Sequence, residues 1–88
     1  MGFIKQKLVE LRQLATRAEH GEEITEKMCL EKVNTIIEHI KICKDVDPNE
    51  NLKRFKWRLK ITIDTVHKNQ PKYKEILEIC FSLFPDRL

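Results

Sequence analysis

Eighty-eight residues make one domain, of a size that buries only roughly 60–65% of the surface exposed by its unfolded chain. With 41% hydrophobic and 35% charged residues, the composition excludes a disordered chain. The net charge is only +3 and the pI is about 8.8, short of the value above about 9 that is typical of a dedicated nucleic-acid-binding domain. Two glycines and three prolines favour a few long helices over many short strands, so we expect a single helical domain over residues 1–88.

No part of the sequence predicts export or membrane insertion. Charged residues interrupt the first dozen positions, so we expect no signal peptide, and the longest uncharged run, residues 79–85, is too short to cross a bilayer. The three cysteines are an odd number without a CxxC pair, and each lies within an apolar stripe. We therefore expect reduced, buried thiols in a cytoplasmic protein that does not contact membranes.

The first predicted helix covers about residues 2–20 and has one apolar face. Leucine and alanine residues recur there at helical spacing, while Lys5 and Arg12 face away from them. Gly21 then supplies the left-handed residue that commonly closes a helix. A single apolar side predicts an outer helix of a bundle.

The second predicted helix, about residues 23–45, is apolar on two sides. Glutamates at its start place negative charge on the positive end of the helix dipole, and Thr25 is the cap if the helix begins later. Its broad apolar stripe runs from Cys29 to Cys43, and the opposite side carries Ile24, Met28, Ile42 and Val46. This pattern predicts neighbours on both flanks, so the helix either lies centrally in the bundle or gives one flank to a second copy of the chain in a homodimer.

The clearest helix boundary lies between the second and third helices. Asp47 is a favourable cap, Pro48 suits the first helical position, and Glu50 stands three residues after the cap, as a capping box requires. The third predicted helix covers about residues 48–68, and the proline that breaks it opens a fourth over about residues 71–84. Short connections favour antiparallel neighbours, so we expect an all-α fold, a small up-and-down bundle of four helices.

The third predicted helix is unusually basic. Residues 48–88 carry nine basic and five acidic groups, net +4, whereas residues 1–47 carry eight basic and nine acidic groups, net −1. Trp57 and Ile61 are four residues apart and point away from the core stripe into the middle of the basic side. Two interpretations are open: the bundle buries both residues beneath lysine and arginine stems, or Trp57 is an exposed anchor ringed by cations.

The second interpretation leads to the main functional hypothesis, a non-catalytic regulator, inhibitor or adaptor that docks this helix onto an acidic or amphipathic surface of a protein partner. The expected partner-binding residues are Lys53, Arg54, Trp57, Arg58, Lys60, Ile61 and Lys68. An alternative is a nucleic-acid-binding accessory protein, in which the same cations contact phosphates and the indole stacks on bases. A third is a self-associating structural protein whose second helix forms the seam of a dimer.

No arrangement of residues predicts catalysis or a cofactor. His39 and Cys43 are four residues apart, but no second pair with ligand spacing accompanies them, and a structural zinc site needs four ligands. Carboxylate pairs such as Glu22 with Glu23 lie among solvated charges, where no apolar pocket is implied. Since the sequence also lacks a glycine-rich phosphate loop and a nucleophile elbow, we expect no enzyme activity, no metal and no cofactor.

Overall fold

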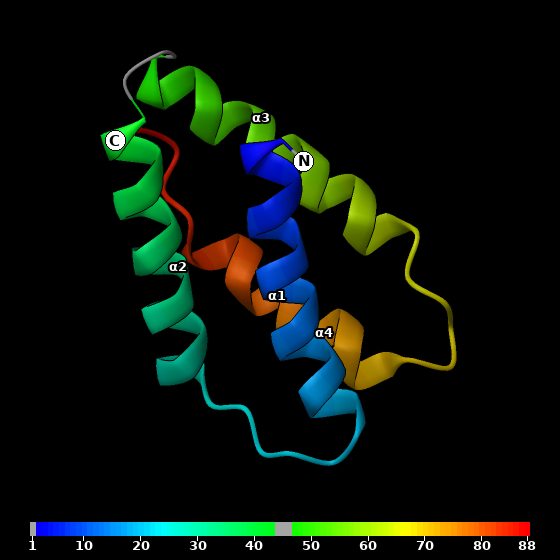
Figure 1. Cartoon of the computed structure of the whole chain (residues 1–88). Helices are drawn as coiled ribbons and strands as arrows, with labels where there is room; N and C mark the ends of the chain where they lie inside the picture. Colours follow the sequence, from blue (N-terminus) through cyan, green and yellow to red (C-terminus); the bar gives the residue numbers. More distant parts are fainter. Residues whose placement is uncertain (1, 44–46) are drawn as a thin grey trace.

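The computed structural model describes residues 2–43 and 47–88, which form four helices and no strand (Figure 1). The helices alternate in direction along the chain, and α3 crosses the others obliquely (Figure 1). Their bounds are α1 (Phe3–Glu19), α2 (Glu26–Ile42), α3 (Pro48–Asp64) and α4 (Pro71–Leu83). The principal extents are 38 × 25 × 24 Å. The prediction of a small all-α bundle of four helices is confirmed.

Two helices begin where side-chain caps are available. The Thr25 hydroxyl accepts a hydrogen bond from the Met28 N–H at 3.2 Å, so α2 begins at Glu26, three residues later than the main prediction. The Asp47 carboxylate accepts from the Asn49 N–H at 3.0 Å, and Pro48 takes the first position of α3, as predicted. Among the described residues, no hydrogen bond from a helix N-terminal backbone N–H to a Glu or Gln side chain completes a capping box.

The helix ends are set by glycine and by threonine hydroxyls. Gly21 has a φ of 97°, which confirms its role in closing α1. The Thr65 hydroxyl donates to the Thr62 carbonyl at 3.0 Å. In the turn that follows, the His67 ring nitrogen Nδ1 is hydrogen-bonded to the side chain and to the backbone N–H of Asn69. These hydrogen bonds compete with the helical ones, and α3 ends at Asp64. The prediction that the third helix continues to residue 68 is therefore wrong.

The second helix also ends before its predicted limit. Cys43 takes an extended conformation after α2, so the helix stops at Ile42. The predicted continuation to residue 45 otherwise falls on residues 44–46, which lie outside the described residues together with Val46 of the second apolar flank. Elsewhere on that flank Ile42 is 66% exposed, and Leu30, also on α2, is 42% exposed. Self-association through these side chains stays a prediction.

Both α3 and α4 pack against each of the other three helices, and α4 has the most extensive contacts. Its 13 residues carry a wide apolar face, and Leu77 and Cys80 are completely buried. After α4 the chain returns to α3, where the Phe55 and Phe84 rings lie 5.0 Å apart between centroids. Of the two alternatives for the second helix, the central place is wrong: α2 packs mainly against α3 and α4 and leaves part of one flank exposed, while α4 has the most extensive contacts. This arrangement leaves α1 and α3 side by side at the surface described next.

Candidate functional site

The predicted partner-binding residues of α3 lie on its exposed side because the opposite side belongs to the core. Leu52, Phe55 and Leu59 are buried, so the positions between them turn outward. We call this outward side the basic face; it consists of Lys53, Arg54, Trp57, Arg58, Lys60 and Ile61, each of which is exposed. Lys68 is also exposed, but it lies in the turn between α3 and α4, so it does not share the helical face as predicted.

Trp57 differs from an ordinary core tryptophan because 62% of its surface is exposed. Ile61, one turn further along α3, is 41% exposed, so two large apolar side chains lie near each other outside the core. The interpretation in which the bundle buries both residues is therefore wrong. An exposed indole surrounded by cations is typical of an interaction site.

Trp57 forms part of the wall of a groove between α1 and α3. Near the start of α1, an open hollow of about 610 Å³ lies between the apolar side chains of Phe3, Ile4 and Trp57. A second hollow of about 260 Å³ follows one turn further along. Lys5, Trp57 and Arg58 line both hollows, so the two lie next to each other. We call them together the Trp57 groove.

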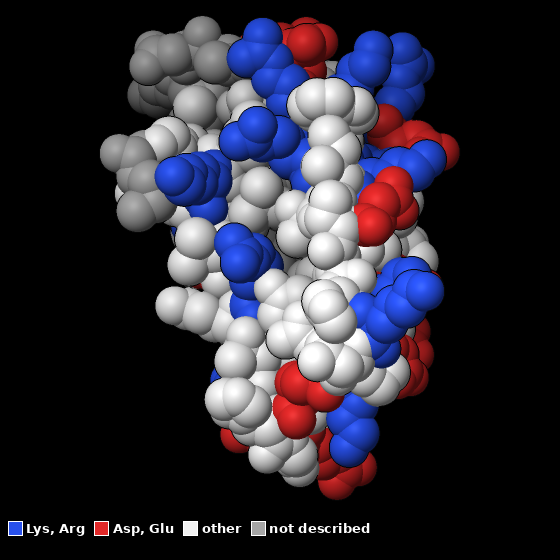
Figure 2. Space-filling view, turned by 90° about the vertical axis from the view of Figure 1, so that its right-hand side faces the viewer, with Lys and Arg blue, Asp and Glu red and all other residues white. Residues whose placement is uncertain are grey.

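The charged side chains that line the Trp57 groove are all positive. They are Lys5 and Arg12 of α1 and Arg54 and Arg58 of α3, and no Asp or Glu lines either hollow in the described part of the chain. Arg54 lies 3.6 Å from Glu50, whereas the other three have no ion-pair partner among the described residues. On the face seen in Figure 2, Lys and Arg gather over the upper part, and Asp and Glu lie mainly toward the right-hand edge and the lower end. The groove therefore attracts negative groups.

Lys56, on another side of α3, has a structural role. Its Nζ lies 3.1 Å from the Asp86 carboxylate and 3.4 Å from the Pro85 carbonyl, and it stands 5.6 Å from the centroid of the Phe81 ring. These contacts attach the C-terminal tail to α3. Lys56 is thus engaged within the chain, unlike Lys53, Lys60 and Arg58.

The contribution of α1 is absent from the sequence-based prediction. Periodicity assigns Phe3 and Ile4 to the core and Lys5 and Arg12 to solvent, whereas all four line the Trp57 groove. The groove depends on which side of α1 lies next to α3, and α2 separates these helices in the sequence. No spacing within one helix carries that information.

The described cysteines are free thiols, with Cys29 and Cys80 buried and Cys43 half-buried. Burial raises the pKa of the Cys80 thiol to about 12, with a further contribution from the neighbouring Cys29 thiol, and burial also raises the pKa of Cys29. Within residues 2–43 and 47–88, no group of three His, Cys, Asp or Glu side chains could hold a metal ion.

Comparison of the chain with protein-family models, with curated proteins and with solved structures finds no match. None of the helices in the described ranges is long and apolar enough to cross a membrane. What the protein binds is therefore inferred from the geometry and charge of the Trp57 groove.

Proposed function

We propose that this protein is a non-catalytic interaction module of the cytoplasm, a regulator, inhibitor or adaptor that binds an acidic, amphipathic segment of a partner protein in the Trp57 groove. The observation that carries the proposal is the exposed indole of Trp57 in a groove whose charged lining, among residues 2–43 and 47–88, is entirely cationic. Free thiols at Cys29, Cys43 and Cys80 suit a reducing compartment.

The apolar part of the groove provides the binding energy. Trp57 lies beside Phe3 and Ile4, and covering these side chains would remove apolar surface from water on both partners. Tryptophan is among the residues enriched at interface hot spots, where truncation to alanine costs about 2 kcal/mol or more. We therefore assign the anchoring role to Trp57.

The cationic part of the groove selects the partner. Lys5 and Arg58 line both hollows beside Trp57, so a segment seated on the indole places its flanking side chains next to these two cations. Carboxylates at those positions would be attracted, whereas lysines would be repelled. An amphipathic helix supplies apolar anchors on one face and carboxylates beside them, which is the helix-in-groove mode of recognition. Occupation of the groove can then block or bridge partner surfaces without any chemical step.

A peptide-binding experiment tests this proposal directly. The probe is a fluorescein-labelled synthetic peptide with leucines at helical spacing on one face and glutamates on the other, and its control is a scrambled peptide of the same composition. We expect the ordered peptide to bind and Trp57→Ala to weaken binding by roughly 30-fold, which corresponds to about 2 kcal/mol. Without a label, the emission of Trp57, the only tryptophan, should shift to the blue on binding.

A matched variant separates anchoring from general loss of apolar surface. Ile42→Ala removes an apolar side chain from α2 that is 66% exposed, so it should leave peptide affinity unchanged. Equal binding by the wild type and by Trp57→Ala, or equal weakening by Ile42→Ala, would reject the groove as the docking site.

The lack of acidic residues along the groove favours a second candidate, a single-stranded nucleic acid. Base stacking on Trp57 and phosphate contacts to Lys5, Arg12 and Arg58 would serve such a ligand. The modest net charge of +3 makes it second to the protein partner.

An oligothymidylate titration at several salt concentrations tests the nucleic-acid candidate. If phosphates provide the affinity, the logarithm of the binding constant falls linearly with the logarithm of the salt concentration, and Arg58→Gln reduces that slope by about one. Lys27→Gln, an exposed residue of α2, is the control that should leave the slope unchanged. Absence of oligothymidylate binding at low salt eliminates this candidate and leaves the peptide experiment unaffected.

A further inference from the structure

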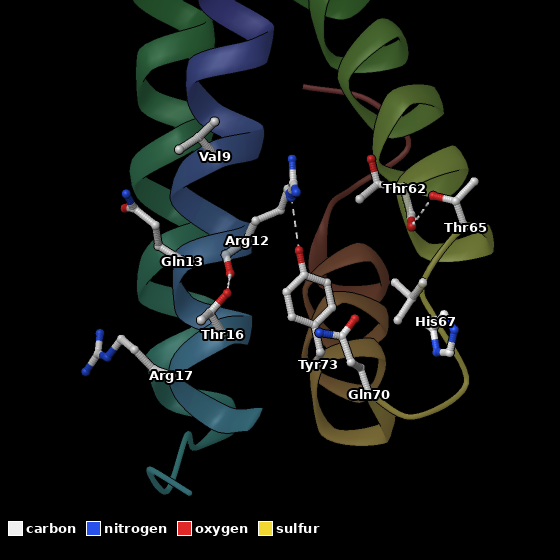
Figure 3. Close-up of a pocket in the computed structure, with 11 residues that line it drawn as sticks. Val9, Arg12, Gln13, Thr16, Arg17, Thr62, Thr65, His67, Gln70 and Tyr73 are labelled. Carbon is white, nitrogen blue, oxygen red and sulfur yellow. Dashed lines mark hydrogen bonds between the residues drawn. The ribbon is translucent and has the colours of Figure 1, made fainter. Parts of the chain in front are cut away.

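A further cleft of about 1080 Å³ adjoins the Trp57 groove, where α1, the end of α3 and the start of α4 meet. Arg12 stands at the join together with Val9 and Thr62, since these three residues line both the cleft and the second hollow of the groove. Figure 3 shows Arg12 reaching from α1 toward Tyr73 of α4, with Gln70 beside Tyr73 and Thr62 on the α3 side. The cleft differs from the groove in that most of the residues that line it are polar.

The Arg12 guanidinium is positioned by a neutral group. Its Nε donates to the Tyr73 hydroxyl oxygen at 3.0 Å, and Tyr73 is only 9% exposed. Tyr73 is itself held, because its backbone N–H donates to the Glu19 carboxylate at 3.0 Å. The terminal Nη groups of Arg12 and the Tyr73 hydroxyl proton therefore remain as donors beside this hydrogen bond.

The charge of Arg12 is also not neutralised within the protein. Arg12 forms no ion pair among the described residues, and the cleft has no Asp or Glu in its lining. The Glu19 carboxylate caps the start of α4 and lies outside that lining. A second cation, Arg17, lines the cleft but is engaged by Glu22. Arg12 is thus the cation best placed to receive an anion.

We propose that this cleft binds a small organic phosphate, with the phosphate on Arg12 and the Tyr73 hydroxyl. A guanidinium with free Nη groups matches the oxygens of a phosphate in a forked geometry. The Gln70 amide adds a polar partner, and the apolar side chains of Val9 and Val66 form a wall for the organic part of the ligand. This site is distinct from the peptide-binding function proposed for the Trp57 groove.

The test is a titration of the isotope-labelled protein followed by NMR, with AMP as the probe. We expect AMP to shift the Arg12 Nε–H signal and the backbone signals of Gln70 and Tyr73, and to bind at least tenfold more tightly than adenosine or citrate. Arg12→Gln should weaken AMP binding at least tenfold, and Tyr73→Phe, which keeps the ring and removes the positioning hydroxyl, should weaken it by a smaller factor. Inorganic phosphate should produce the same shifts at lower affinity.

Control variants keep the experiment decisive. Arg87→Gln removes an exposed cation of the tail and Trp57→Ala removes the groove anchor, so both should bind AMP as the wild type does. Arg12→Lys keeps the positive charge and should retain part of the affinity, even if the glutamine variant loses stability. Unchanged AMP affinity in Arg12→Gln, equal binding of citrate and AMP, or no shifts at millimolar AMP would each overturn the proposal.

Discussion

Phe55 and Trp57 lie two residues apart on α3 in opposite environments, so replacing each by alanine gives the sharpest test of how this helix is oriented. Phe55 is completely buried and packs on Phe84, whereas Trp57 is 62% exposed. Truncation of a buried phenylalanine costs about 3–5 kcal/mol, because the lost transfer free energy is joined by the cost of the cavity. We expect Phe55→Ala to fall in this range.

The expected cost of Trp57→Ala is smaller because little more than a third of that side chain is covered. A tryptophan that buries at most about 100 Å² contributes an upper value of about 2.5 kcal/mol at about 25 cal/mol per Å². The two substitutions should therefore differ by at least about 0.5 kcal/mol, which for a domain of this size is a difference in melting temperature of at least about 2–4 °C.

Urea unfolding followed by circular dichroism is the appropriate assay, since tryptophan fluorescence is lost in Trp57→Ala. Both variants should keep the helical spectrum at low urea, and the free energies of unfolding should rank wild type, Trp57→Ala, Phe55→Ala. If Trp57→Ala destabilises as much as Phe55→Ala, the indole belongs to the core and cannot anchor a partner. The proposed docking of a partner in the Trp57 groove and the orientation of α3 would then both be refuted.

Four further outcomes are expected. Asp47→Ala should lower the free energy of unfolding by about 1 kcal/mol in urea titrations, since it removes the α3 cap. In native protein iodoacetamide should modify Cys43 and spare Cys29 and Cys80, whose pKa values are raised by burial; mass spectrometry should show one adduct natively and three in urea. Because burial raises the pKa of these thiols in the folded state, their contribution to the free energy of unfolding should be constant below about pH 8.5. It should fall as the pH rises toward 12, by at most about 1.4 kcal/mol per pH unit for each thiol. Partial burial of the Glu10 carboxyl opposes its ionisation, but its contacts with Lys7 and Lys32 outweigh this and lower its pKa overall. Glu10→Gln should therefore lower the free energy of unfolding by less than about 1 kcal/mol at neutral pH, and by nothing in acid below the lowered pKa.

Local signals in the sequence predict the helix starts better than the helix ends. Asp47 and Pro48 specify the start of α3 because cap and proline act within one turn, and Gly21 closes α1 for the same reason. The prediction ends α3 at about residue 68 because Asn69, Gln70 and Pro71 break the helix after it. Hydrogen bonds of the Thr65 hydroxyl and of the turn that follows compete with the helix before the proline is reached, and the position of the proline does not reveal them.

Packing between helices is the part that the sequence leaves undetermined. The core stripe of α3 alone predicts that Trp57 points away from that stripe, but its exposure depends on whether the bundle covers that side as well, so two interpretations remain open from the sequence. The sequence does not indicate that α4 has the most extensive contacts, because the apolar faces of α2 and α4 are both wide and either helix could have been covered on two sides. What decides between them is the fit of whole helices against one another, which involves contacts between residues far apart in the chain.

The charge of the Trp57 groove also depends on how the helices pack, and counting charges along the sequence does not predict it. Counting along the chain assigns the positive charge to the second half, net +4, and makes the first half slightly acidic, net −1. In space, Lys5 and Arg12 of that acidic half face the same groove as Arg58, while the acidic residues of the chain line neither hollow in the described ranges. A ligand in the groove experiences this local arrangement, because at physiological salt, charges more than about 8 Å away are largely screened. The modest net charge is therefore compatible with a strongly cationic binding surface, and substitutions in α1 should affect an acidic partner as much as substitutions in α3 do.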